Sequence, residues 1–328
     1  MKVRRAVVTL SLIELIIAIN LARLSNGELQ VGFYRGKCGF ADVEITVASV
    51  VTTWFLRDPT IVAALIRLQF HDCFVNGCDA SILIDGCFSE KTAAPNLSLR
   101  GYDVIDDAKA AVDRVCPGVV PCADLIIIAA RDAVFLSVGE RYEVQTGRRD
   151  GLISLAQNVL IPGPSISVSQ AIPFFVNKGL SPIDMVVLLG AHSVGVAHCS
   201  IIRDSLYNFR NTGMPDLTME PFLADQLRFR CPPNTTTVDS TVNLDQNPFP
   251  FLDYYMQILS NRGILPIDQE GFDFPTRFGA AMVKLGAIQV LNGTQGEIRT
   301  SCRATNRPPI CLTILLKINQ NIFCPLNI

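Results

Sequence analysis

Apolar residues recur three and four positions apart along several stretches of the chain, a spacing that puts them on one face of an α-helix. The expected helices are residues 61–71, 102–115, 122–136, 168–178, 181–189 and 277–285. Strands have room only for short pairs, and the proline- and glycine-rich stretches 160–164 and 232–237 are typical of loops. The pattern predicts a mainly α fold.

The first of these helices carries two polar side chains on one face. Asp58 followed by Pro59 is a good helix start, with a capping carboxylate before a proline in the first turn. Arg67 and His71 are four residues apart, which places a guanidinium and an imidazole on the same side of the helix. Both groups can therefore reach one small ligand.

Oxygen donors crowd the segment that follows this helix. Asp72, Asp79 and Ser81 are separated by main-chain carbonyls, and Cys73 and Cys78 could close the loop between them. Calcium takes carboxylate, hydroxyl and carbonyl oxygens of this kind. A helical histidine is more often structural, and this aspartate spacing alone is a weak signal. Their coincidence in one short stretch indicates a site.

Histidine chemistry is limited to three residues, His71, His192 and His198. His192 follows an expected helix that begins with a capping box at residues 181–184, and glycines flank it in the run 190–195. Glycines let a large flat group approach the backbone closely. A haem between two helices, with His192 on the iron and His71 on the other side, fits this arrangement.

Several motifs, in one order along the chain, carry a resemblance to a known family. They are FHDCFVNGCDAS (70–81), EKTAAPN (90–96), LRGYDVID (99–106), CPGVVPCAD (116–124), AARDAV (129–134), GRRDG (147–151), LLGAHSVGVAHC (188–199) and GEIRTSC (296–302). With these motifs the chain resembles the secretory plant haem peroxidases, the class III family, over most of residues 28–306. The resemblance implies a two-lobed fold with the haem between a distal and a proximal helix.

The resemblance also implies an activity and cofactors. Peroxidases of this family reduce hydrogen peroxide to water while they oxidise small donors, typically phenols, in one-electron steps. Haem b and two calcium ions would be the bound groups. Hydrogen peroxide and small phenols are therefore the expected partners.

The same resemblance assigns roles to particular residues. His71 would move the peroxide proton as base and acid, while Arg67 steadies developing charge and Asn96 orients His71. Asp268 would accept the hydrogen bond of His192, the axial ligand of the haem iron; without the resemblance it would read as a solvated loop carboxylate. The remaining expected contacts are Phe70 beside the haem and Pro162 at its exposed edge, where donors arrive.

Two calcium sites follow from the resemblance. The distal ion would take oxygens from Asp72, Val75, Gly77, Asp79 and Ser81 and, through water, from Glu90. The proximal ion would take Ser193, Asp245 and Asp253, but Pro248 stands where the family has a hydroxyl ligand. The chain after Glu270 also omits a helix-sized segment usual in the family. We therefore expect one tight calcium and one weak or empty site.

The chain has 11 cysteines, which in a secreted protein indicates disulfides. The resemblance pairs Cys38 with Cys116, Cys73 with Cys78, Cys122 with Cys302, and Cys199 with Cys231. Cys87, Cys311 and Cys324 have no place in this scheme. An odd total leaves at least one free or intermolecular thiol.

The two ends of the chain flank the expected peroxidase domain at 28–306. Residues 1–27 have a basic start and an apolar run, which predicts a signal peptide rather than a membrane span and hence a secreted protein of the extracellular space or cell wall. The tail 307–328 matches nothing in the family, and as a sorting extension it would direct the protein to the vacuole.

Charge bears on the partners. The chain has 28 Lys and Arg against 30 Asp and Glu, and loss of residues 1–27 removes four basic and one acidic side chain, leaving a net charge of −5. An acidic protein is a poor ligand for nucleic acid. We expect a monomer that acts on small molecules.

Two other functions fit parts of the pattern. A catalytically impaired, peroxidase-like calcium-binding wall protein would explain the altered proximal calcium loop. An unrelated secreted hydrolase could use His71 with a carboxylate, but the chain has no GxSxG or comparable nucleophile motif. Asp124 and Arg148 are expected to form a buried structural ion pair, not a catalytic one.

Overall fold

A computed structural model describes residues 29–137, 139–233, 239–245, 254–269 and 278–307. The α-helices are α2 (Val43–Arg57), α3 (Ile61–Cys73), α4 (Tyr102–Val115), α5 (Cys122–Leu136), α6 (Val168–Asn177), α7 (Pro182–Leu189), α8 (Cys199–Tyr207), α9 (Pro221–Arg230), α10 (Tyr254–Leu259), α11 (Pro266–Gln269) and α12 (Phe278–Gly286). Short 3₁₀ helices are η1 (Ser81–Leu83), η2 (Glu90–Thr92), η3 (Ala94–Asn96), η4 (Ala156–Asn158), η5 (Gly190–Ser193) and η6 (Phe209–Asn211). The predicted mainly α fold is confirmed.

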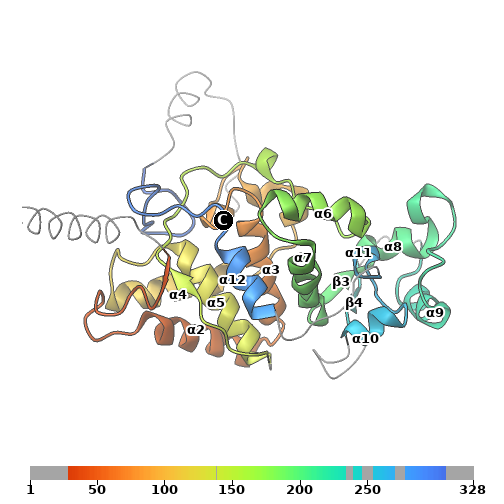
Figure 1. Cartoon of the computed structure of the whole chain (residues 1–328), viewed down its shortest axis with the longest axis horizontal. Coiled ribbons are helices and arrows are strands. Elements are labelled where there is room, and N and C mark those ends of the chain that lie inside the picture. Colours follow the sequence, from red (N-terminus) through yellow and green to blue (C-terminus); the bar gives the residue numbers. More distant parts are fainter. Residues whose placement is uncertain (1–28, 138, 234–238, 246–253, 270–277, 308–328) are drawn as a thin grey trace, which may run out of the picture.

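Helix α5 forms the centre of one half of the molecule. Its sequence is a nearly continuous apolar run, and its residues are buried from Cys122 to Val134, as expected for a helix covered on all sides. Helices α2, α3 and α4 pack against it, and Figure 1 shows α2, α4 and α5 together on one side of the molecule. This packing makes α3, the helix that carries Arg67 and His71, part of a rigid core.

The other half contains α6 to α11 (Figure 1). Helix α7 begins at a capping box formed by Ser181 and Asp184, as the sequence predicts, and leads directly into η5, which carries His192. Helix α12 packs on both α7 and α3. The two helices that lead to the two histidines are therefore joined through a third.

Strands are short, in agreement with the sequence. Two antiparallel pairs are described: β1 (Gln30–Val31) with β2 (Gln145–Thr146), and β3 (Val196–His198) with β4 (Thr241–Asn243). In the second pair Val196 lies opposite Asn243. This ladder holds the chain just after η5 in place.

The boundary of α3 differs from the predicted one. The helix begins at Ile61 with Thr60 as the N-cap residue. The Asp58 carboxylate instead accepts hydrogen bonds from the backbone N–H and hydroxyl of Thr60. Asp58 therefore caps a turn that precedes the helix, and Pro59 lies in that turn.

Four disulfides are the same pairs that the family resemblance implies. They are Cys38–Cys116, Cys73–Cys78, Cys122–Cys302 and Cys199–Cys231. Cys87, which has no place in the family scheme, is also disulfide-bonded. Cys311 and Cys324 lie outside the described residues, as do the expected signal peptide and all but the first residue of the tail.

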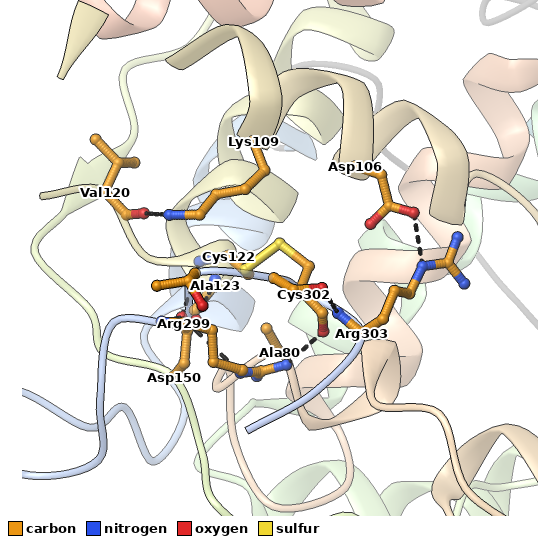
Figure 2. Close-up of a disulfide and its surroundings, with 12 residues drawn as sticks. Ala80, Asp106, Lys109, Val120, Cys122, Ala123, Asp150, Arg299, Cys302 and Arg303 are labelled. Atoms are coloured by element: carbon orange, nitrogen blue, oxygen red, sulfur yellow. Dashed lines mark hydrogen bonds and ion pairs between the residues drawn. A yellow bond between two sulfur atoms is a disulfide. The ribbon is translucent and has the colours of Figure 1, made fainter. Parts of the chain in front are cut away.

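Figure 2 shows how the Cys122–Cys302 disulfide joins the start of α5 to the C-terminal part of the described chain. Next to it, the fully buried Arg299 donates to the carbonyl oxygens of Cys302 at 2.7 Å and of Asp79 at 3.0 Å. Asp150 accepts from the first N–H groups of α5, those of Cys122 and Ala123. The segment around Arg299 therefore braces both α5 and the loop after α3.

Among the described residues no single helix is long and apolar enough to cross a membrane. One pair, Val168–Asn177 with Pro182–Ser193, meets the length and composition test together but is bent by 111°.

Candidate active site

On α3, His71 is held by an asparagine from η3. His71 Nδ1 lies 2.7 Å from Asn96 Oδ1, and the Asn96 amide nitrogen donates to the Glu90 carbonyl at 2.7 Å. Because the amide nitrogen is used elsewhere, the amide oxygen faces the ring and Nδ1 is the donor. Nε2 of His71 is therefore the unprotonated nitrogen, ready to accept a proton.

Arg67 lies against that nitrogen. Its Nε donates to His71 Nε2 at 3.1 Å, and its terminal nitrogens donate to the Ser98 hydroxyl at 3.1 Å and to the Pro95 carbonyl at 2.9 Å. Burial, with the nearby Arg67 charge, lowers the pKa of His71 to about 3. The imidazole is thus neutral at physiological pH. We call Arg67, His71 and Asn96 the distal cluster.

Sequence reasoning did not single out Ser98 or the Pro95 carbonyl. Pro95 directly precedes Asn96 within the motif EKTAAPN, and Ser98 lies two residues after Asn96. Their closeness to Asn96 in the sequence was the one indication that they belong to the site. Nothing in the pattern shows that the Arg67 side chain of α3 reaches them. The two contacts come from η3 folding against α3.

His192 forms a second cluster with a buried carboxylate. Its Nδ1 lies 2.9 Å and 3.1 Å from the two oxygens of Asp268, and Asp268 is on the short helix α11 and only 2% exposed. Burial lowers the pKa of His192, but the charge and hydrogen bond of Asp268 outweigh it, so the pKa is raised. The structure brings these two residues together although 76 positions separate them. We call them the proximal cluster.

The two clusters lie on neighbouring segments. Helix α3 is in contact with η5, and a Cβ added at Gly195, just after η5, would lie 2.9 Å from the Cβ of Ala63 on α3. Glycine is needed there because its φ is 100° and because the two backbones approach so closely. Glycines beside His192 were expected from the sequence to let a flat group approach; at Gly195 the group that approaches is instead helix α3.

Side chains of both clusters have solvent-accessible surface. The side chain of His192 is 30% accessible. Arg67, though hydrogen-bonded to three groups, is also accessible. Two accessible polar clusters on adjoining segments would allow a flat cofactor to bind between α3 and η5.

Phe70 and Pro162, the other two residues expected near the cofactor, have different surroundings. Phe70 packs against Phe74 and Phe175, with ring centroids 4.7 Å and 6.1 Å away. Pro162 is half-buried in the loop before α6. The same loop reaches α11, since the Pro164 carbonyl accepts from the Ile267 N–H at 3.4 Å. The loop of Pro162 therefore adjoins the helix of Asp268.

The loop after α3 gathers buried oxygens. Asp72, Ser81 and Glu90 each have a side-chain oxygen that is buried and has no hydrogen-bond partner among the described residues. Burial, and then the charges of Asp79 and Glu90, raise the pKa of Asp72. The pKa of Glu90 is raised to about 8, chiefly by burial. A bound cation would satisfy these oxygens and remove the mutual repulsion.

Main-chain groups of this loop are also fixed. Gly77 has a φ of 111°, and a Cβ there would lie 2.4 Å from the Gln289 carbonyl. In the described ranges no group of three or more His, Cys, Asp or Glu side chains is arranged to hold a metal. A calcium ion in this loop would therefore also use the Ser81 hydroxyl and carbonyls such as those of Val75 and Gly77.

The expected proximal calcium site is described only in part. Ser193 and Asp245 are both buried, and the Ser193 hydroxyl has no hydrogen-bond partner within the described part of the chain. Asp253, Pro248 and Glu270 lie outside the described residues. Asp124 and Arg148 form the expected buried ion pair at 2.7 Å.

Comparisons with known proteins agree with this geometry. The family model described as "Peroxidase" matches residues 47–284. Peroxidase 60 of Arabidopsis thaliana is 46% identical over 93% of this chain and 99% of its own length, and Peroxidase 57 of the same plant is 43% identical over 89% and 97%. Peroxidase N1 of Nicotiana tabacum is 40% identical over 90% and 96%. Over such lengths these identities show that the chain belongs to the class III family of plant peroxidases.

Proposed function

We propose that this peroxidase binds haem b between α3 and η5, where His192 would hold the iron, and that it oxidises small phenols. The observation that carries the proposal is the pair of hydrogen-bonded clusters, Arg67–His71–Asn96 and His192–Asp268, on two adjoining segments. The haem would supply the redox chemistry that carries electrons from donors to hydrogen peroxide. The impaired, calcium-binding alternative is not favoured, since the relatives are named as peroxidases.

His71 is the acid and base of the reaction. Nε2, the unprotonated nitrogen, would take one proton of hydrogen peroxide and give it to the oxygen that leaves as water. Asn96 keeps the other ring nitrogen protonated and the ring oriented, because its Oδ1 accepts from Nδ1 at 2.7 Å. The contact of Arg67 Nε with Nε2 must open for the peroxide to enter.

Arg67 stabilises the charge that develops as the O–O bond breaks. Its terminal nitrogens are anchored on Ser98 and Pro95, so the guanidinium can leave Nε2 without leaving the site. A cation held beside the reacting oxygens stabilises negative charge as it develops there. Arg67 therefore acts on charge and His71 on the proton.

Asp268 makes His192 a stronger electron donor. The carboxylate accepts from Nδ1 of the imidazole, and the other ring nitrogen, Nε2, would hold the iron. The negative charge of Asp268 gives the ring partial imidazolate character, which favours the oxidised cofactor over the reduced one. Donors would approach at the loop of Pro162.

The pH profile of peroxide consumption should reflect the low pKa of His71. Because burial and Arg67 lower this pKa to about 3, Nε2 stays available at pH values well below 6.5, the ordinary pKa of an imidazole. We expect the second-order rate constant to be flat from pH 7 to about 4 and to fall below that. Stopped-flow absorbance measures it, with circular dichroism as the control for folding at each pH. A fall centred near 6.5 would contradict the assigned environment of His71.

An absorbance spectrum tests the proposed cofactor. Purified protein supplied with haem should show a strong Soret band that shifts when hydrogen peroxide is added. A well-folded preparation without this band would rule the proposal out. Turnover with a panel of phenols, compared with non-phenolic donors, tests the donor class.

The two calcium sites should differ in strength. The distal loop offers a full set of oxygens, whereas the proximal one has Pro248 in place of a hydroxyl. After brief chelation, metal analysis should find about one calcium per chain. Asp79→Asn should remove that ion, while Asp245→Asn should not change the count. Two equally retained ions in the unmodified protein would show that Pro248 is tolerated.

We infer that the mature enzyme is a secreted monomer of the extracellular space or cell wall. Class III relatives are typically secreted, and the basic and apolar start of the chain is that of a signal peptide. N-terminal sequencing of the secreted protein would test cleavage near residue 27, and size-exclusion chromatography with light scattering would test the monomer.

A further inference from the structure

The distal calcium loop, residues 72–81, is contacted by segments from elsewhere in the fold. The Cys78 N–H donates to the Ile288 carbonyl at 3.2 Å, just after α12. Gly77 lies directly against Gln289. The loop is therefore shaped by residues that belong to neither α3 nor the loop itself.

A lysine reaches the same loop from the end of α6. Lys178, the residue that follows the last turn of α6, donates from Nζ to the Val75 carbonyl at 2.6 Å and to Gln289 Oε1 at 2.8 Å. The Val75 carbonyl is one of the oxygens that a distal calcium would use. A carbonyl has two lone pairs, so the ammonium and a metal ion can share it, but they then lie close together with like charge.

The surroundings of the loop are strongly acidic. Asp72, Asp79 and Glu90 are all buried, and burial together with mutual repulsion raises the pKa of Asp72. Among the described residues, two cationic side chains touch main-chain carbonyls of this loop, Arg299 at Asp79 and Lys178 at Val75. The side chains of Arg299 and Lys178 differ in how freely they can move away from the loop.

Arg299 is fully buried and cannot leave. Lys178 is half-buried at the end of a helix, and its long side chain can turn towards solvent. Of the two cations, only Lys178 can therefore give way when a metal ion enters.

We propose that Lys178 acts as a built-in cation of the distal calcium loop. When calcium is absent, the Lys178 ammonium holds the Val75 carbonyl and offsets the charge of the acidic cluster; when calcium binds, the ammonium repels the ion. This inference rests on the proposed distal calcium site. A group that interacts better with the calcium-free loop than with the loaded one lowers calcium affinity by that difference. Lys178 would thus set how readily the site exchanges its ion.

Replacing Lys178 tests the inference through calcium affinity, without reference to peroxidase turnover. Lys178→Met on the haem-loaded protein should bind calcium about tenfold more tightly, since a hydrogen bond from a charged group at a half-exposed position is worth about that factor. The calcium-free variant should also unfold at a lower temperature than the calcium-free wild type. Titration in calcium buffers and thermal unfolding with and without calcium measure the two effects.

Matched variants separate charge from packing. Lys178→Arg keeps the charge and should behave as wild type, and Lys178→Gln should bind calcium more tightly, which also serves if the Met variant does not fold. Lys284→Met removes a lysine that pairs with Asp184 and should leave calcium affinity unchanged. Unchanged or weaker calcium binding by Lys178→Met and Lys178→Gln would overturn the role of Lys178. A wild-type protein that binds no calcium would overturn the distal site itself.

Discussion

Replacing His71 with alanine is expected to slow the reaction with hydrogen peroxide at least about 100-fold, because positioned acid–base catalysis contributes roughly that much or more. The variant should retain haem, since His71 is on the distal side and His192 would still hold the iron. Stopped-flow measurement of the change in Soret absorbance at varied peroxide concentrations gives the rate constant. Asn96→Ala should cause a smaller loss, because it frees the ring without removing it.

Two controls make the result specific to His71. His198 is the third histidine, lies at the surface and pairs with Asp239 at 3.6 Å, so His198→Ala should react as the wild type does. Arg67→Leu should slow the reaction less than His71→Ala, since it removes charge stabilisation but leaves the base. A wild-type rate in His71→Ala would show that another group moves the proton.

Local signals in the sequence predicted the parts of the site that lie on one element. The spacing of Arg67 and His71 predicted their shared helix face, and the structure joins them by a 3.1 Å hydrogen bond. The capping box at Ser181 and Asp184 predicted the helix before His192. These features depend on residues three or four positions apart, which a helix brings together whatever the rest of the fold does.

Helix α2 was not among the expected helices, for a physical reason. Its sequence is rich in Val, Ile and Thr, which are weak helix formers and are more common in strands. The helix forms because Asp42 caps its start and because Val43, Val47 and Val51, four apart, are buried, where α2 packs on α5. Tertiary burial overrides local preference there.

Contacts between distant segments were out of reach of pattern reasoning alone. His192 and Asp268 were paired only through the family resemblance, and the surroundings of Asp268 alone suggested a solvated loop. Nothing in the sequence indicated that Lys178 would reach Val75, 103 positions away, or that Arg299 would reach Asp79, 220 positions away. Such contacts depend on how whole helices pack, which periodicity does not encode.

Replacing His192 with alanine is expected to abolish stable haem binding, to below about a tenth of the wild-type haem content, because the axial bond to iron would be lost. Haem per chain is measured from the pyridine haemochrome spectrum after gel filtration, and circular dichroism confirms that the variant is folded. Added imidazole should restore part of the haem and its Soret band, because the alanine leaves a cavity of the right size beside Asp268.

Two further variants, at Asp268 and His198, are the controls for His192→Ala. Asp268→Asn should keep the haem but raise its Fe(III)/Fe(II) reduction potential. In the wild type the buried carboxylate lies 2.9 Å from His192 Nδ1 and increases electron donation to the iron, and the neutral amide of the variant would not. His198→Ala should change neither haem content nor potential, because its ring is 44% accessible beside Asp239 at the surface. Haem loss in His198→Ala, with unchanged haem in His192→Ala, would show that His198 and not His192 binds the iron. The two measurements together test the roles assigned to the proximal cluster, because haem content depends on the His192 imidazole and the reduction potential depends on the Asp268 carboxylate behind it.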